Sequence, residues 1–414
     1  MPDPTCIRPP RCGLALTLAA ALLAVSAFDG AAPRAQDEVR ALWVVRTTLT
    51  SPAAIDTMVK TAATAGFNTL LVQVRGRADA YYAGGTEPRA SLLTSQPSFD
   101  PLAETIARAQ HAGLQVHAWV NVNLIAGVGE LPAARDHVIY RHPEWLMVPR
   151  ALVDDLADVP VRSPEYLGRL ARYVRSQSSE VEGLYLSPIA PAAVEYTSGV
   201  VRDIVERYAV NGIHLDYVRY PREDFDYSRD TLAAFRRKVA DDLTPDDRNK
   251  YDARLAAEPL IYTEAFPERW REFRTNQLTR LVASLRQAVK SARPAALLSA
   301  AVVPDPNEAS TRRFQDWRGW LERDLIDVIC PMAYTTDADI FAFQVAAARA
   351  IAGPRPLWAG IGAYRLSPPQ IVANVRTARR LGVGGIILFS YDSLTDPTRG
   401  TDYLSQVGRA AFMP

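Results

Sequence analysis

Eight short runs of apolar residues, rich in β-branched and aromatic side chains, constrain the fold of this chain more than any other feature. Runs of this kind are typical of strands that are buried on both faces of a parallel sheet. They span Val39–Thr47, Thr69–Arg75, Gln115–Asn123, Gly212–Tyr220, Leu297–Pro304, Asp327–Tyr334, Pro356–Tyr364 and Gly384–Tyr391.

Helical patterns lie between most of these runs. Two of them end in a glycine just before the next strand, at Gly66 and Gly382, which is the repeating unit of a β/α array. The predicted helices are Ser51–Ala65, Pro101–Ala112, Thr197–Tyr208, Pro267–Ala292 and Pro369–Leu381. No G-x-G-x-x-G follows the first strand, which disfavours a dinucleotide-binding sheet. We therefore expect an α/β fold, a (β/α)8 TIM barrel.

Two connections are longer than a barrel requires. Leu124–Pro191 follows the third strand and Arg222–Pro267 follows the fourth. Loops of this length are usually functional. Since each follows the carboxyl end of a strand, we expect both to form walls over that face of the barrel.

The composition is that of a globular protein, with 48% hydrophobic and 22% charged residues and a net charge of +1. This balance lacks the basic excess of a nucleic-acid-binding protein, so we expect no nucleic-acid partner. The 5 histidines show no H-x-x-x-H or H-E-x-x-H spacing, and Cys330 is the one cysteine after the N-terminal segment. We expect no metal site and no cofactor.

The N-terminal segment has the order of a secretory signal. Arg8 and Arg11 precede the apolar run Leu14–Phe28, and small residues follow in Gly30–Gln36. We predict a signal segment over residues 1–36 and a single domain over 37–414, exported to the periplasm or the cell exterior. If the segment stays uncleaved, it would anchor the protein in the inner membrane, its one expected membrane contact.

The fourth predicted strand carries charge inside an apolar run. In Gly212–Pro221, Asp216 and Arg219 lie among Ile213, Leu215 and Val218. Carboxylates and guanidinium groups are rarely buried unless they are paired or functional. Asp216 is therefore either half of a structural ion pair or a catalytic group at the carboxyl end of a barrel strand.

The other predicted strands end in similar chemistry. On the third strand Trp119 and Asn121 lie two residues apart, so their side chains share one face. Aromatic rings, amides, arginines and carboxylates also gather at the remaining strand ends, including Arg46, Arg75, Asp79, Asp305, Glu308, Tyr334, Tyr391 and Asp392. Sugar rings stack on aromatic side chains and sugar hydroxyls bond to such polar groups, which indicates a carbohydrate pocket.

Cleavage of a glycosidic bond commonly uses two carboxyl groups. Asp216 is the strongest candidate for one of them. The second is left open between Asp305, Glu308 and Asp392. An arginine close to a carboxylate lowers its pKa, so Asp216 would be the nucleophile or base if Arg219 pairs with it.

Five ordered motifs resemble the glycosyl-hydrolase-like 10 family over about residues 38–395. They are Ala41–Val44, Val72–Tyr81, Val116–Asn121, Gly212–Pro221 and Pro331–Tyr334, and a family loop is also matched by His142–Trp145. The family has bacterial envelope members, some of which hydrolyse peptidoglycan glycan strands that lack stem peptides. Its motif positions fall on Arg75, Asp79, Trp119, Asn121, Asp216, Arg219 and Tyr334. The chain departs from the pattern at Tyr217, which replaces an acidic residue, and at Gly76–Ala78.

The resemblance and the residues together predict a glycoside hydrolase that acts on a bacterial cell-wall glycan or a related polysaccharide. Asp216 would be a catalytic carboxylate, with Asp305 or Glu308 as its partner by analogy with other barrels. The remaining residues would bind the sugar: Arg75, Asp79, Trp119, Asn121, Arg219, Tyr334, Tyr391 and Asp392. Two alternatives stay open, a non-catalytic glycan-binding protein of the envelope and an α-amylase-like enzyme on storage glucans.

Overall fold

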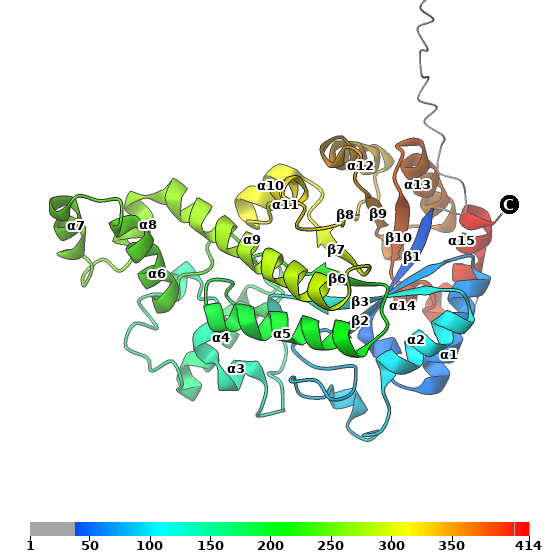
Figure 1. Cartoon of the computed structure of the whole chain (residues 1–414), viewed down its shortest axis with the longest axis horizontal. Helices are drawn as coiled ribbons and strands as arrows, with labels where there is room; N and C mark the ends of the chain where they lie inside the picture. The colour runs from blue at the N-terminus through cyan, green and yellow to red at the C-terminus, as the bar shows by residue number, and fades with distance from the viewer. Residues whose placement is uncertain (1–37, 401, 414) are drawn as a thin grey trace, which may run out of the picture.

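The computed structural model describes residues 38–400 and 402–413, and the predicted signal segment lies outside them. Its parallel strands close into a barrel in the order β1-β10-β9-β8-β7-β6-β3-β2, as Figure 1 shows. The barrel strands are β1 (Val39–Val44), β2 (Thr69–Arg75), β3 (Gln115–Asn121), β6 (Gly212–Asp216), β7 (Leu297–Val302), β8 (Val328–Ala333), β9 (Trp358–Ile361) and β10 (Gly385–Phe389). The prediction of an eight-stranded (β/α)8 barrel is confirmed.

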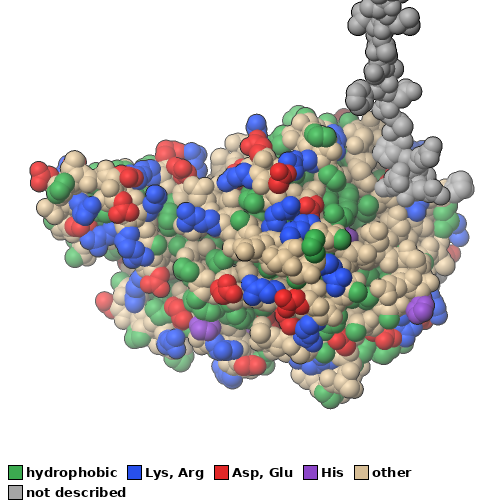
Figure 2. Space-filling view, viewed as in Figure 1, with side chains coloured by type: hydrophobic (Ala, Val, Ile, Leu, Met, Phe, Trp, Pro, Cys, Tyr) green, Lys and Arg blue, Asp and Glu red, His purple; other side chains and the backbone are tan. Residues whose placement is uncertain are grey.

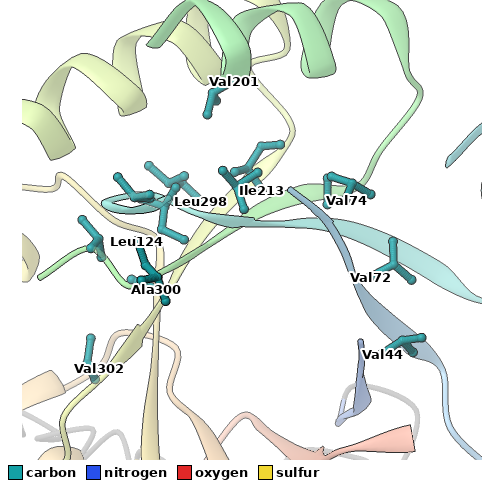
Figure 3. Packing of buried hydrophobic residues seen from close by; sticks show 14 of the residues in the cluster. Val44, Val72, Val74, Leu124, Val201, Ile213, Leu298, Ala300 and Val302 are labelled. Atoms are coloured by element: carbon teal, nitrogen blue, oxygen red, sulfur yellow. The ribbon is translucent and has the colours of Figure 1, made fainter. Parts of the chain in front are cut away.

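The side chains of each strand alternate between two hydrophobic clusters. Outward-facing residues such as Val72, Ile213 and Leu298 pack under the surrounding helices, and Figure 3 shows this layer. Inward-facing residues such as Trp43 and Trp119 fill the barrel interior. Because both faces are buried, the strands read as continuous apolar runs in the sequence.

Helices cover the outside of the barrel. They are α1 (Pro52–Thr64), α2 (Pro101–His111), α5 (Pro191–Arg207), α9 (Pro267–Ala292), α10 (Pro306–Arg312), α11 (Trp317–Glu322), α12 (Ala338–Ala352), α13 (Pro368–Arg380), α14 (Tyr391–Leu394) and α15 (Tyr403–Phe412). Ser51 caps α1 by accepting a hydrogen bond from the amide of Ala54, as its sequence predicts. The helix predicted from Thr197 begins earlier, at Pro191, which occupies the first turn of α5.

Both long insertions fold into defined elements. The first contains β4 (Leu124–Gly127) and β5 (Gly183–Tyr185), which pair antiparallel, together with α3 (Val138–Arg141) and α4 (Pro164–Ser176). The second contains α6 (Arg229–Ala240), α7 (Pro245–Asp252) and α8 (Ile261–Ala265), which extend to the left of the barrel in Figure 1.

The α6–α8 extension has a hydrophobic cluster of its own, centred on Phe235, Tyr262 and Trp270. Its surface carries charges of both signs, which Figure 2 shows. Among the residues that the structure describes, no helix has the length and apolarity needed to cross a bilayer.

Two histidines lie fully buried inside the barrel. Burial lowers the pKa of His117 to about 4 and that of His214 to about 3, so both rings are neutral near pH 7. The His214 ring accepts a hydrogen bond from Trp43 Nε1 at 3.0 Å, and its Nδ1 lies 2.9 Å from Ser299 Oγ. Nδ1 therefore carries the proton and donates to the serine. Neither ring nitrogen of His117 has a hydrogen-bond partner.

Because these histidines are buried in the neutral form, we expect the unfolding free energy to decrease at acidic pH. The unfolded chain takes up protons near pH 6.5 while the folded chain does not, so stability falls from that pH down to about 4. Each histidine contributes a slope of up to about 1.4 kcal/mol per pH unit. We expect a His117→Leu variant to show a shallower slope of unfolding free energy against pH, measured by urea titration. A His111→Leu variant, changed at an exposed histidine, is the matched control; an unchanged slope for His117→Leu would contradict the prediction.

Candidate active site

A cavity of about 250 Å³ opens at the carboxyl ends of the barrel strands. Catalytic sites of TIM barrels lie at this end. The side chains that line the cavity come from seven of the barrel strands and the loops after them: Trp43, Val45, Arg46, Gln73, Arg77, Trp119, Asn121, Asp216, Tyr217, Arg219, Ala301, Met332, Tyr334 and Phe389. The structure thus brings together Trp119, Asn121, Asp216, Arg219 and Tyr334, which were all predicted site residues.

Asp216 ends β6 and is 8% exposed. Its Oδ2 accepts a hydrogen bond from Trp119 Nε1 at 3.1 Å, and its Oδ1 accepts one from the amide of Tyr217 at 2.7 Å. Burial nevertheless raises the pKa of Asp216 above its ordinary value, because desolvation outweighs these hydrogen bonds and the charges of Arg219 and Arg77. The environment therefore destabilises the charged form of Asp216 relative to a carboxylate in water.

Arg219 does not neutralise Asp216, although the sequence left that pairing open. Its Nη2 forms an ion pair with Glu182 Oε1 at 2.6 Å. Burial raises the pKa of Glu182, but the charge of Arg219 and the hydrogen bonds from Arg219 and Tyr185 together outweigh burial and hold that pKa below its ordinary value. Glu182 lies in the first insertion, just before β5, and was not among the predicted site residues. The condition under which Asp216 would be a nucleophile or base is not met.

A chain of polar contacts crosses one wall of the cavity. Trp119 Nε1 also donates to Asn121 Oδ1 at 3.0 Å, and Gln73 Nε2 donates to the same oxygen at 3.2 Å. Arg46 Nη1 donates to Gln73 Oε1 at 2.8 Å. Since each side chain holds the next, the wall is fixed before any ligand arrives.

A second part of the cavity lining is aromatic. The rings of Tyr334 and Phe389 lie 5.5 Å apart between centroids, and Trp43 contacts both in edge-on geometry. The Trp43 indole is held by its bond to His214. An aromatic wall facing amides and one carboxyl group is the arrangement that binds a sugar ring.

The predicted partner carboxylates lie elsewhere. Asp305 is exposed and caps α10, where its side chain accepts hydrogen bonds from the amides of Asn307 and Glu308. Neither Asp305 nor Glu308 lines the cavity. Within residues 38–400 and 402–413, Asp216 is the one carboxylate in the cavity lining. The assignment of Asp305 and Glu308 as catalytic partners of Asp216 is corrected: Asp305 caps the N-terminus of α10.

Arg75 also lies outside the cavity. A bulge in β2 shifts the register, so that Gln73 pairs with Trp119 but Arg75 pairs with Val120 instead of Asn121. The shift turns Arg75 away from the interior, where its guanidinium forms a fully buried ion pair with Glu87 at 2.7 Å. A side chain with no exposure cannot contact a sugar, so the predicted binding role of Arg75 is corrected to a structural one.

Three further residues that were predicted to contact the sugar lie outside the cavity lining. Asp79 Oδ1 accepts hydrogen bonds from the amides of Gly76 and Arg77 and so holds the turn after β2. Asp392 accepts hydrogen bonds from the amide of Val45 and from the hydroxyl of Thr48, which fixes the end of β1. Tyr391 is buried in the outer hydrophobic cluster. None of the three predicted contacts lines the cavity.

Several lining residues were not predicted as sugar contacts: Trp43, Arg46, Gln73, Arg77 and Tyr217. Trp43 and Gln73 stood in family motifs, and their alternation with outward-facing neighbours would have identified them. Tyr217 has φ 50, a conformation that directs the chain away from the strand immediately after Asp216. Sequence periodicity carries no signal for such a turn.

Comparison with known proteins decides the family. A model of the family described as Glycosyl hydrolase-like 10 matches residues 38–369. The chain belongs to this family. The resemblance noted in the sequence is therefore confirmed, and the prediction of a glycosidase agrees with it.

The chain is similar to curated relatives that are longer than itself. Glycosyl hydrolase YngK of Bacillus subtilis is 24% identical over 84% of this chain and 66% of its own length. Glycosyl hydrolase DigH of Escherichia coli is 23% identical over 65% of this chain and 55% of its own length. The chain thus spans less than two thirds of either relative.

Among solved structures, the glycoside hydrolase domain of PgaB from Bordetella bronchiseptica superposes with a TM-score of 0.59 at 15% identity. The match covers 88% of this chain and 98% of that domain. At this identity the likeness concerns the fold, which is a TIM barrel. In the part of the chain that the structure describes, no group of three or more His, Cys, Asp or Glu side chains could hold a metal ion.

Proposed function

We propose that this chain is a glycoside hydrolase that cleaves bacterial cell-wall glycan, with Asp216 as its general acid. One observation carries the proposal: a buried carboxyl group at the end of β6 whose pKa is raised, inside a cavity with an aromatic wall. A general acid must hold its proton until the glycosidic oxygen takes it. The names of the relatives YngK and DigH support hydrolysis of glycosidic bonds.

The cavity walls would position the sugar for this step. Tyr334 and Phe389 offer aromatic faces to the ring, and Asn121 and Gln73 offer amides to its hydroxyls. The Trp119 indole, which donates to Asp216 Oδ2, would hold the carboxyl group in one orientation. Asp216 then donates its proton to the glycosidic oxygen, and the bond from that oxygen to the anomeric carbon breaks.

The nucleophile would come from the substrate. Asp216 is the one carboxylate in the lining among the described residues, so the lining offers no second carboxylate to attack the anomeric carbon. Sugars of the cell wall carry a 2-acetamido group, and some glycosidases use its carbonyl oxygen as the nucleophile. Its attack would give a cyclic oxazolinium. Water would then attack the anomeric carbon and lose a proton to the Asp216 carboxylate, which restores both the acetamido group and the acid.

The test is incubation of the purified protein with glycan strands freed of stem peptides, followed by chromatography of the soluble products. We expect soluble oligosaccharides from these strands and none from an unsubstituted glucan, which lacks the acetamido group. A thiazoline analogue of the cyclic intermediate should inhibit. Release of glucan fragments would instead support an α-amylase-like enzyme.

The missing second carboxylate also supports a different candidate, a glycan-binding protein of the envelope. Such a protein would keep the aromatic wall and the amides without turnover. Binding of the strands without any release of products, at every pH between 4 and 8, would favour this candidate over hydrolysis. Either protein would act outside the cytoplasm, which the basic and apolar order of residues 1–36 supports.

A further inference from the structure

The charges of the cavity do not balance. Its lining contains three guanidinium groups, Arg46, Arg77 and Arg219, and one carboxyl group, Asp216. Arg219 is paired with Glu182. Across residues 38–400 and 402–413, no carboxylate lies within ion-pair distance of Arg46 or Arg77. The cavity therefore keeps an excess positive charge even when Asp216 is ionised.

Arg46 is held in this position by its surroundings. Its Nη1 donates to Gln73 Oε1, and its Cδ lies where a side chain at position 76 would otherwise be. A Cβ on Gly76 would come within 2.5 Å of that Cδ. The chain thus uses a glycine to bring a guanidinium group against the backbone at the cavity edge.

Arg77 is placed by the turn that follows β2. Asp79 bonds to the amides of Gly76 and Arg77 and not to the guanidinium group, which donates through Nη1 to the Gly76 carbonyl at 2.8 Å. Burial and the neighbouring charge of Arg46 lower the pKa of Arg77. The two arginines therefore share a confined space in which the charge of Arg46 disfavours that of Arg77.

Holding two like charges together with no carboxylate in ion-pair contact is unfavourable unless a ligand supplies the opposite charge. Guanidinium groups bind carboxylates with charge-assisted, often bidentate hydrogen bonds. We infer that Arg46 and Arg77 bind a carboxylate carried by the glycan. This inference rests on the proposed function, and it narrows the substrate to an acidic polysaccharide.

Two kinds of glycan offer such a group. A peptidoglycan strand without stem peptides exposes a free lactyl carboxylate on its muramic acid residues, because the peptide is attached there. A polyuronate carries a carboxylate on the sugar ring itself. In both cases a neutral derivative of the same polymer exists, so the charge can be removed while the chain is kept.

The experiment compares each acidic polymer with its neutral form. Stem-peptide-free strands are used with free carboxylates or as methylamides, and oligouronates are used as such or after reduction to alcohols. Binding is measured by titration calorimetry and turnover by product release. We expect the parent to prefer one acidic polymer over its neutral form by about 10- to 100-fold, the effect of a charge-assisted hydrogen bond. Added salt should reduce this preference.

The Arg77→Gln variant should lose most of the preference, because its affinity for the acidic form falls while that for the neutral form stays. Arg318→Gln is the matched control, since it removes one positive charge from an exposed pair on α11. It should keep the preference. Equal binding of acidic and neutral forms by the parent, or an undiminished preference in Arg77→Gln, would overturn the inference. Equal turnover of the acidic and neutral forms would contradict this inference but not the proposed hydrolase. Preferential binding of the acidic form without turnover would contradict the proposed hydrolase but not this inference.

Discussion

An Asp216→Asn variant is expected to lose turnover of the glycan by about 10²- to 10⁴-fold in kcat/KM, the contribution of a general acid. Asparagine keeps the shape of the side chain and can still accept the hydrogen bond from Trp119, but its amide is too weak an acid to give a proton to the leaving oxygen. Product release from stem-peptide-free strands measures the effect. Asp305→Asn is the matched control, because asparagine caps a helix as well as aspartate does. Full activity of Asp216→Asn would rule out the acid role.

The pH dependence tests the same group in a second way. An acid acts while protonated, so kcat/KM of the parent should fall as pH rises through the raised pKa of Asp216. The contribution of Asp216 to folding stability also decreases as pH rises. A carboxyl group whose pKa is higher in the folded state contributes stability at low pH, and this is lost as pH rises through the folded-state pKa. The Asp216→Asn variant lacks this pH-dependent contribution. The difference between its unfolding free energy and that of the parent should therefore shift in favour of the variant as pH increases.

Breaking the buried Arg75–Glu87 pair is expected to have the largest effect on stability. Both side chains have 0% exposure, and Arg75 also donates to the backbone carbonyls of Asn121 and Val122. Glu87→Ala would leave a buried guanidinium group without a counterion, which typically costs about 3–5 kcal/mol. Urea unfolding followed by tryptophan fluorescence measures this loss.

Two further variants distinguish the cost of an unpaired buried charge from a non-specific loss of stability. Arg75→Met combined with Glu87→Leu removes both charges and should recover part of the loss, although the two carbonyls lose their donor. Glu322→Gln breaks the exposed pair with Arg318 and should change stability by less than about 1 kcal/mol. A Glu87→Ala loss no larger than that of Glu322→Gln would contradict the prediction.

Periodicity was enough to predict the barrel. A strand buried on both faces leaves a continuous apolar run, and all eight runs became barrel strands. The predicted ends were less accurate, as with the fourth strand, which stops at Asp216 because Tyr217 adopts a positive φ. Local backbone turns of this kind depend on tertiary contacts and not on the hydrophobic pattern.

The site was predicted in part for the same reason. Trp119, Asn121 and Asp216 line the cavity because they end regular strands, where alternation fixes the direction of each side chain. The prediction that Arg75 contacts the sugar was wrong because one extra residue in β2 reverses the direction of its side chain. Glu182 was missed because it approaches Arg219 from 37 residues away in the chain, a contact that no local pattern encodes.

The bond between Trp43 and His214 has a consequence for how relatives of this chain could diverge. The Trp43 indole, part of the aromatic wall of the cavity, is hydrogen-bonded to the neutral His214 ring, which is hydrogen-bonded in turn to Ser299, so this wall is continuous with the interior of the barrel. A change there would disturb three strands together. A change of ligand preference would therefore disturb the barrel least in the turns that carry Arg77 and Tyr217, whose side chains reach the cavity from outside the strands.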